Sequence, residues 1–156
     1  MITFDLELGI DAIADILRSE FSAKLQAVYA QQRVQIPFRD LAAVYVDEVE
    51  TIDAYPCCEI IAANSDFENE NSNVFVHELS LQFSVNGDNP QLMAREVKRL
   101  VSAGRKLFSG TLQPYVAGRF RSARSDYGPT SAGRNESFIK SAALQVFWYT
   151  VGIELA

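Results

Sequence analysis

The sequence has few of the residues from which catalytic and metal sites are usually built. Its 156 residues include one histidine, His77, and two cysteines, Cys57 and Cys58, which are neighbours in the chain. Neighbouring side chains of a strand point to opposite faces, and a disulfide between them would be strained. One chain therefore offers neither a disulfide framework nor a Cys/His zinc site.

Catalytic motifs are lacking as well. The sequence contains no Gly-x-Ser-x-Gly elbow, no phosphate-binding P-loop, no dinucleotide fingerprint after a strand and no His-Glu-x-x-His. We predict that the protein is not an enzyme and has no catalytic, cofactor-binding or metal-binding residues. One alternative stays open, a small α+β enzyme or ligand-binding domain in which Cys57 or Cys58 meets His77 across neighbouring strands.

Long apolar runs and targeting signals are also missing. No window approaches the roughly 18 consecutive apolar residues of a membrane-spanning helix, and residues 1–7 lack the basic-then-apolar layout of a secretory signal. With 48% hydrophobic residues, the chain can bury a core of its own. We expect a single soluble intracellular domain over residues 1–156, without a membrane partner.

Positive charge is absent from a third of the chain. Between Leu41 and Ala94 there is no Lys or Arg, yet ten Asp and Glu occur there, and between Arg95 and Lys140 ten Lys and Arg face three acids. Such a division can orient partner molecules, unless folding brings the two halves side by side. Both outcomes are open at this stage.

Hydrophobic periodicity predicts two helices. Apolar residues recur at spacings of three and four from about Gly9 to Gln32, after a strand-like alternation over residues 1–8 that suggests an N-terminal arm. A second stripe runs to Phe108, with Asp88 or Asn89 as N-cap, Pro90 in the first turn, an exposed basic side and Gly110 as a stop.

The rest of the chain favours strands. Short strands are predicted over residues 44–49 and 57–63, a polar acidic connection over 64–73 and a long alternating strand over 74–85. Residues 115–137 form a long Arg/Gly-rich loop region, part of which is open to a strand assignment. The last strand, 138–155, is apolar on both faces, so it is either central in the sheet or covered by another subunit.

These elements predict an α+β fold, because the strands are grouped and their links are short. We expect a mainly antiparallel sheet of about four to five strands, with two helices packed on one face.

The order of these features resembles that of the tail terminator and tail completion proteins of tailed bacteriophages, which belong to the neck between head and tail. An amphipathic N-terminal helix leads to Tyr55-Pro56 before a strand, and a polar acidic connection follows. A strand with a central His77 and an Asp-started helix at Asp88 come next. The resemblance covers residues 9–112.

The resemblance implies a structural, non-enzymatic subunit of a homohexameric ring that caps the tail tube and joins it to the head. Its partners would be further copies of itself, the tail tube protein and neck or connector proteins. It would be located in the virion, and in the host cytoplasm during assembly. Nucleic acid is not expected as a partner, apart from DNA passing through the ring lumen. Another phage morphogenesis role, in head completion or related to the tube, is the alternative.

Within this hypothesis, an acidic edge of one subunit meets a basic edge of the next. The candidate subunit-interface residues are Asp66, Glu68, Glu70, Arg119, Arg121, Arg124 and Trp148.

Overall fold

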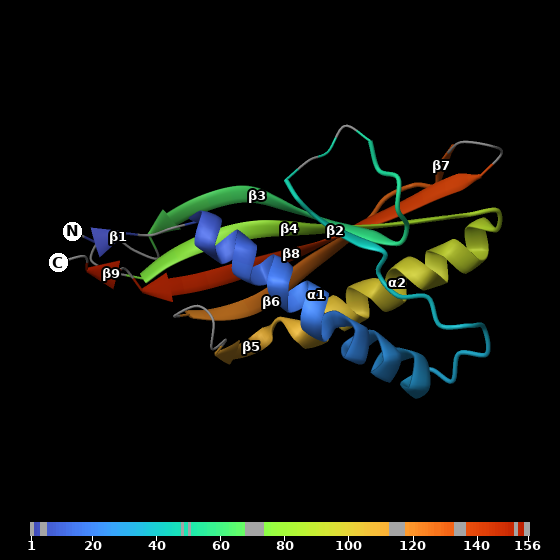
Figure 1. Cartoon of the computed structure of the whole chain (residues 1–156), viewed down its shortest axis with the longest axis horizontal. Helices are drawn as coiled ribbons and strands as arrows, with labels where there is room; N and C mark the ends of the chain where they lie inside the picture. Colours follow the sequence, from blue (N-terminus) through green and yellow to red (C-terminus); the bar gives the residue numbers. More distant parts are fainter. Residues whose placement is uncertain are drawn as a thin grey trace.

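The computed structural model describes residues 2–3, 6–47, 49, 51–67, 74–112, 118–132, 137–151 and 153–154. The fold is α+β, as predicted (Figure 1). Its elements are β1 (Ile2–Thr3), α1 (Leu6–Gln31), β2 (Ala43–Val46), β3 (Cys57–Phe67), β4 (Val74–Gly87), α2 (Pro90–Leu107), β5 (Ser109–Leu112), β6 (Gly118–Tyr127), β7 (Ser131–Ala132), β8 (Phe138–Val151) and β9 (Ile153–Glu154).

One main sheet organises the molecule. Its strands follow the order β2-β3-β4-β8-β6-β5, with β7 also paired to β8, so the sheet has slightly more strands than predicted. All its pairs are antiparallel except β2 with β3. A separate small sheet joins β1 and β9. Strand β8 lies between β4 and β6. Of the two explanations offered for its two apolar faces, a central position in the sheet is therefore the one that the structure shows.

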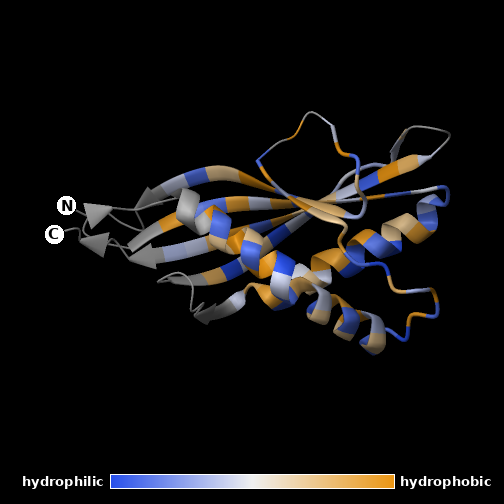
Figure 2. Ribbon diagram, in the orientation of Figure 1, coloured by the Kyte–Doolittle hydropathy of each residue, from blue (hydrophilic) through white to orange (hydrophobic). Residues whose placement is uncertain are grey.

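Both helices lie against one face of this sheet (Figure 1). That face carries alternate residues of the long strands, and the resulting alternation of hydrophobic and hydrophilic positions is visible along the ribbon (Figure 2). The buried residues include Leu79, Leu81 and Phe83 of β4 and Leu144 and Val146 of β8, all fully covered. They form one core with the apolar stripes of α1 and α2.

The second helix begins where its sequence predicts. Asn89 is the N-cap, and its side-chain oxygen accepts hydrogen bonds from the backbone N–H groups of Gln91 (3.0 Å) and Leu92 (3.2 Å). These bonds satisfy two N–H groups that have no partner within the helix. The end differs from the prediction, because the helix stops at Leu107 and Gly110 lies in β5.

The predicted N-terminal arm is too long. Helix α1 begins at Leu6, so only Ile2–Thr3 of the arm is a strand, pairing with β9. The apparent alternation of residues 2–8 hid a helical spacing, since Leu6 lies four residues before Ile10 and seven before Ile13.

The predicted acidic connection is partly strand. Strand β3 continues to Phe67, so Asp66 lies within it and pairs with Val76 of β4. Polar residues are tolerated there because the side chains of Asn64 and Ser65 are exposed. Pairing with a long neighbouring strand supplies the backbone hydrogen bonds that those residues would otherwise seek in a turn.

The predicted Arg/Gly-rich loop region is partly strand, a possibility that the sequence left open. Gly118–Tyr127 forms β6, which pairs with β5 on one side and with β8 on the other. The stretch Arg119-Phe120-Arg121 has the period of a strand, and Phe120 at its centre is fully buried. Gly128 to Thr130 remain outside the strands, and Ser131–Ala132 form β7.

Candidate interaction surfaces

His77 is buried on the helix-covered face of β4, with 1% of its surface exposed. Its Nδ1 lies 2.8 Å from the hydroxyl oxygen of Ser65, the residue directly opposite on β3. Its ring stacks on Trp148 with a centroid distance of 4.8 Å. Burial lowers the pKa of this imidazole. A substrate cannot reach a side chain so covered, which favours a structural role for His77.

The two cysteines lie far from His77. Cys58 pairs with Phe83, whereas Ser65, seven residues further along β3, pairs with His77. Seven residues of strand span about 23 Å, so neither cysteine meets His77. Burial raises the pKa of the Cys57 thiol to about 11 and that of Cys58 well above its usual value. The Cys–His pairing left open by the sequence is therefore contradicted.

The described residues contain no group of three or more His, Cys, Asp or Glu that could hold a metal ion. Within the same part of the chain, no helix combines the length and apolarity that crossing a membrane requires.

Trp148 does not lie at a surface, although the sequence led us to expect it at a subunit contact. Its side chain is only 2% exposed and stacks between His77 and Phe120, with centroid distances of 4.8 and 6.2 Å. The prediction failed because β8 carries large apolar residues on both faces, and the residue pattern alone does not tell which face the helices cover.

Four of the charged candidates fall on described strands. Asp66 pairs with Val76, Val76 with Tyr149, and Tyr149 with Arg119, so Asp66 and Arg119 share one row across the sheet. Three strand spacings separate them, about 14 Å. Arg121 and Arg124 are exposed further along β6.

The remaining charged candidates, Glu68 and Glu70, lie outside the described residues, and so do the side chains of Asp66 and Arg119. The row nevertheless places the acidic side of the sheet at β3 and the basic side at β6. On β3, the pairing with β2 ends at Ile60, and no other described strand pairs with the far side of residues 61–67.

Three ion pairs are found among the described side chains. Arg124 Nε lies 3.2 Å from the carboxylate of Asp126, Arg39 lies 3.3 Å from Glu96, and Arg18 lies 3.7 Å from Asp15. None of these three joins the acidic stretch before Ala94 to the basic stretch after it.

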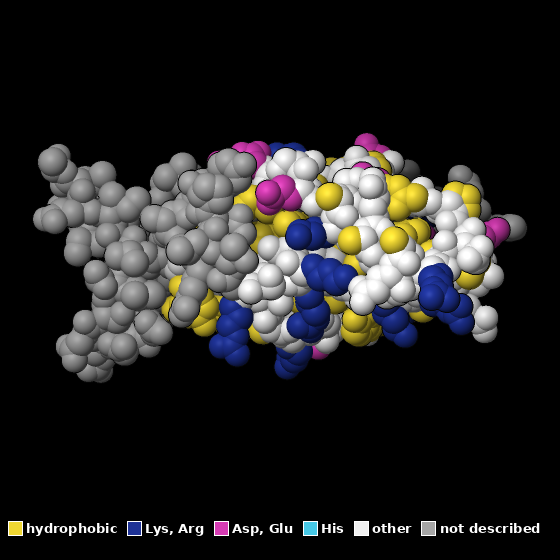
Figure 3. All heavy atoms as spheres, turned by 90° about the horizontal axis from the view of Figure 1, so that it is seen from below, with side chains coloured by type: hydrophobic (Ala, Val, Ile, Leu, Met, Phe, Trp, Pro, Cys, Tyr) yellow, Lys and Arg dark blue, Asp and Glu magenta, His cyan; other side chains and the backbone are white. Residues whose placement is uncertain are grey.

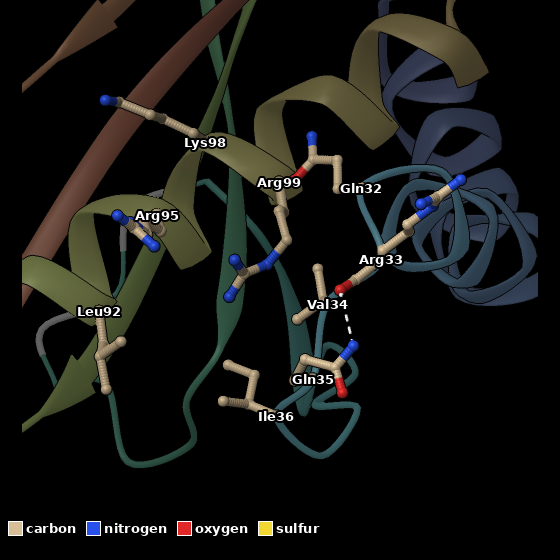
Figure 4. A pocket seen from close by; sticks show the side chains of 9 residues that line it. All are labelled: Gln32, Arg33, Val34, Gln35, Ile36, Leu92, Arg95, Lys98 and Arg99. Atoms are coloured by element: carbon tan, nitrogen blue, oxygen red, sulfur yellow. Dashed lines mark hydrogen bonds between the residues drawn. The ribbon is translucent and has the colours of Figure 1, made fainter.

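A basic pocket lies between α2 and the segment that follows α1, and the sequence did not predict it. Its volume is about 460 Å³, and the nine residues lining it include four cations and no acid. They are Gln32, Arg33, Val34, Gln35, Ile36, Leu92, Arg95, Lys98 and Arg99 (Figure 4). Lys and Arg side chains spread over the face of the molecule seen from below, where Asp and Glu are few (Figure 3).

Arg99 is the unexpected member of this pocket. Its sequence position suggested the exposed basic side of the helix, but only 6% of its surface is exposed. Helix α1 packs against α2 here, and the Arg99 guanidinium carbon lies 4.9 Å from the centre of the Tyr29 ring. The spacing of Arg95, Lys98 and Arg99 in the sequence indicates that they share one face of a helix. Nothing in the sequence indicates that residues 32–36 lie against that face.

No known family model matches the chain, and no curated protein matches it in sequence.

Proposed function

We propose that the protein is a structural subunit of a tailed-bacteriophage neck or tail, a tail terminator that forms a ring, caps the tail tube and joins it to the head. The proposal begins from the order of sequence features over residues 9–112. The α+β architecture, with two helices on one face of a mainly antiparallel sheet, is compatible with it.

The observation that carries the proposal is the placement of opposite charge on different sides of one sheet. Asp66 lies on β3 and Arg119 on β6, in the same row of the sheet and with two strands between them. Copies that join the β3 side of one subunit to the β6 side of the next use two different patches. Such a heterologous contact generates a closed ring when the rotation per subunit fits the circle. Complementary charge fixes which patches meet.

The uncovered sheet face supports an assembled role as well. Among the described residues, Ala143, Gln145 and Phe147 of β8 alternate with the core positions and are partly exposed, on the face without helices. Phe147 and Tyr149 give this face apolar area, and such area is typical of surfaces that meet another protein.

The test is growth of tail tubes. Purified protein is added to tubes polymerising from the tail tube protein of the same genome, and tube lengths and ends are measured by electron microscopy. We expect tubes to stop growing and to carry a ring of density at one end. Unchanged lengths and bare ends would contradict the proposal. Binding to head connectors without any effect on tubes would favour the head-completion alternative instead.

A further inference from the structure

The basic pocket is a concave site with charge of one sign. Arg33 comes from the segment after α1, and Arg95, Lys98 and Arg99 come from α2. In Figure 4 the Arg99 guanidinium points into the space between α2 and Val34. Four cations brought together without an acid among the lining residues repel one another, which an anionic ligand would relieve.

Arg99 provides the strongest evidence for a ligand. Its Nε and Nη2 atoms are buried and have no hydrogen-bond partner in the described part of the chain. Its neighbours are the Tyr29 ring and, one turn earlier on α2, Glu96, whose carboxylate is already paired with Arg39 at 3.3 Å. Buried guanidinium N–H groups without acceptors are costly, and an oxyanion is the acceptor that their planar fork fits best.

The other walls of the pocket are apolar. Val34 is partly buried against the core, while Ile36 and Leu92 are large hydrophobic residues with 40% and 46% of their surface exposed. A ligand that fills about 460 Å³ beside them therefore needs an apolar part next to its negative group.

We propose that this pocket binds an acidic segment of a partner protein, with a carboxylate on Arg99 and an adjacent apolar side chain against Ile36 and Leu92. Single-stranded nucleic acid fits less well, because the nine lining residues include no aromatic side chain on which a base could stack. The formal net charge of −6 also opposes a polyanion. The inference is independent of the proposed ring contact, which uses β3 and β6.

The binding test uses the full-length chain and two fluorescein-labelled peptides. One is fluorescein-aminohexanoyl-Leu-Glu-Phe-Glu-amide, and its matched control, fluorescein-aminohexanoyl-Leu-Gln-Phe-Gln-amide, carries the same label and has nearly the same shape without the Glu carboxylates. A fluorescein-labelled twelve-nucleotide oligo(dT) is the third probe. Fluorescence anisotropy at low salt is expected to show saturable binding of the acidic peptide. The amide peptide and oligo(dT) should each bind at least about tenfold more weakly.

Variants locate the binding site. Replacing the exposed pair, Arg95→Gln with Lys98→Gln, is expected to weaken acidic-peptide binding at least about tenfold. Arg99→Lys keeps the charge but removes the planar fork, and is expected to weaken binding too. Arg105→Gln with Lys106→Gln removes two charges from the same helix outside the pocket, and should leave binding unchanged.

Several results would overturn the inference. They are equal affinity for the acidic and amide peptides, tighter binding of oligo(dT), and equal losses in the pocket variants and the Arg105/Lys106 control. Circular dichroism identifies any variant that fails to fold. If Arg99→Lys fails to fold, the comparison between the Arg95/Lys98 variant and the Arg105/Lys106 control tests the location of the binding site. None of these results depends on whether the protein terminates tail tubes.

Discussion

His77 shows how one polar residue can be accommodated inside an apolar sheet. Ser65 occupies its Nδ1, Trp148 stacks on its ring, and its surface is almost completely covered. Burial lowers its pKa from the ordinary value of 6.5. The folded protein therefore binds a proton on His77 less readily than the unfolded chain does, and stability should decrease as the pH falls through 6.5.

We predict that His77→Asn reduces this loss of stability, because asparagine can still hydrogen-bond Ser65 but does not titrate in this range. The free energy of unfolding is measured in urea at pH 7.5 and pH 5.5 for both proteins. The drop between the two pH values should be smaller in the variant, even if its stability at pH 7.5 is lower. Equal drops would show that other groups set the pH dependence.

At the scale of elements, the clearest periodic patterns led to correct predictions. The stripe of α2, its Asn89 cap and the alternation of β4 are purely local signals, and the structure agrees with all three. Strand β6 was only left open as a possibility, because Gly118, the arginines and the serines of this segment resemble a loop. Its partners on β8 lie 15 to 32 positions further along the chain, from Tyr127↔Ala142 to Gly118↔Thr150.

The pocket could not be predicted for the same reason. Arg95 and Arg99 are one turn apart on α2, which the sequence shows, but Val34 reaches them only through the packing of α1 on α2. That packing also buries Arg99 beside Tyr29. Long-range contacts of this kind leave no local periodicity in the sequence.

The contact between α2 and the sheet depends on one small residue. A Cβ atom at Gly104 would lie 3.0 Å from Leu144 Cδ2 and 3.2 Å from Phe83 Cζ, both in the fully buried core. We predict that Gly104→Val lowers the free energy of unfolding by about 2 kcal/mol, because overpacking outweighs the small gain in helix propensity. Urea denaturation measures the change.

Ser102→Val on the same helix is the matched control, since Ser102 is only partly buried. It should alter stability by no more than about 0.5 kcal/mol. A Gly104→Val protein as stable as the wild type would mean that the helix can move away from β4 and β8 without loss of packing.

At the scale of the whole molecule, the division of charge along the sequence becomes a division across the sheet. Asp66 on β3 and Arg119 on β6 share a row but stand about 14 Å apart. That separation is too great for the two residues to pair directly within one subunit. Arg95, Lys98 and Arg99 of α2 belong to a different surface, around the pocket.

The β6 contact predicts a specific response to charge reversal. Arg121→Glu with Arg124→Glu places acids where an acidic neighbour is expected. The double variant should weaken self-association by at least about tenfold at roughly 50 mM salt, and by less at roughly 500 mM, where the charges are screened. Sedimentation velocity over a range of protein concentrations measures the association. Lys24→Glu with Lys106→Glu makes the same change in net charge on the helices, and should have little effect.

A second reversal tests the pairing itself. Mixing the Arg121→Glu/Arg124→Glu protein with a Glu68→Lys/Glu70→Lys protein creates complementary patches on different copies, so mixed dimers should form although each variant associates poorly alone. In a ring of alternating variants, contacts of wild-type sign alternate with doubly reversed contacts, and opposite charges meet at both, so larger mixed assemblies should form as well. Association restored only in the mixture would therefore identify the β3–β4 connection as the partner of β6. Absence of any restoration would contradict the pairing, because the two reversed patches should attract as the original ones did.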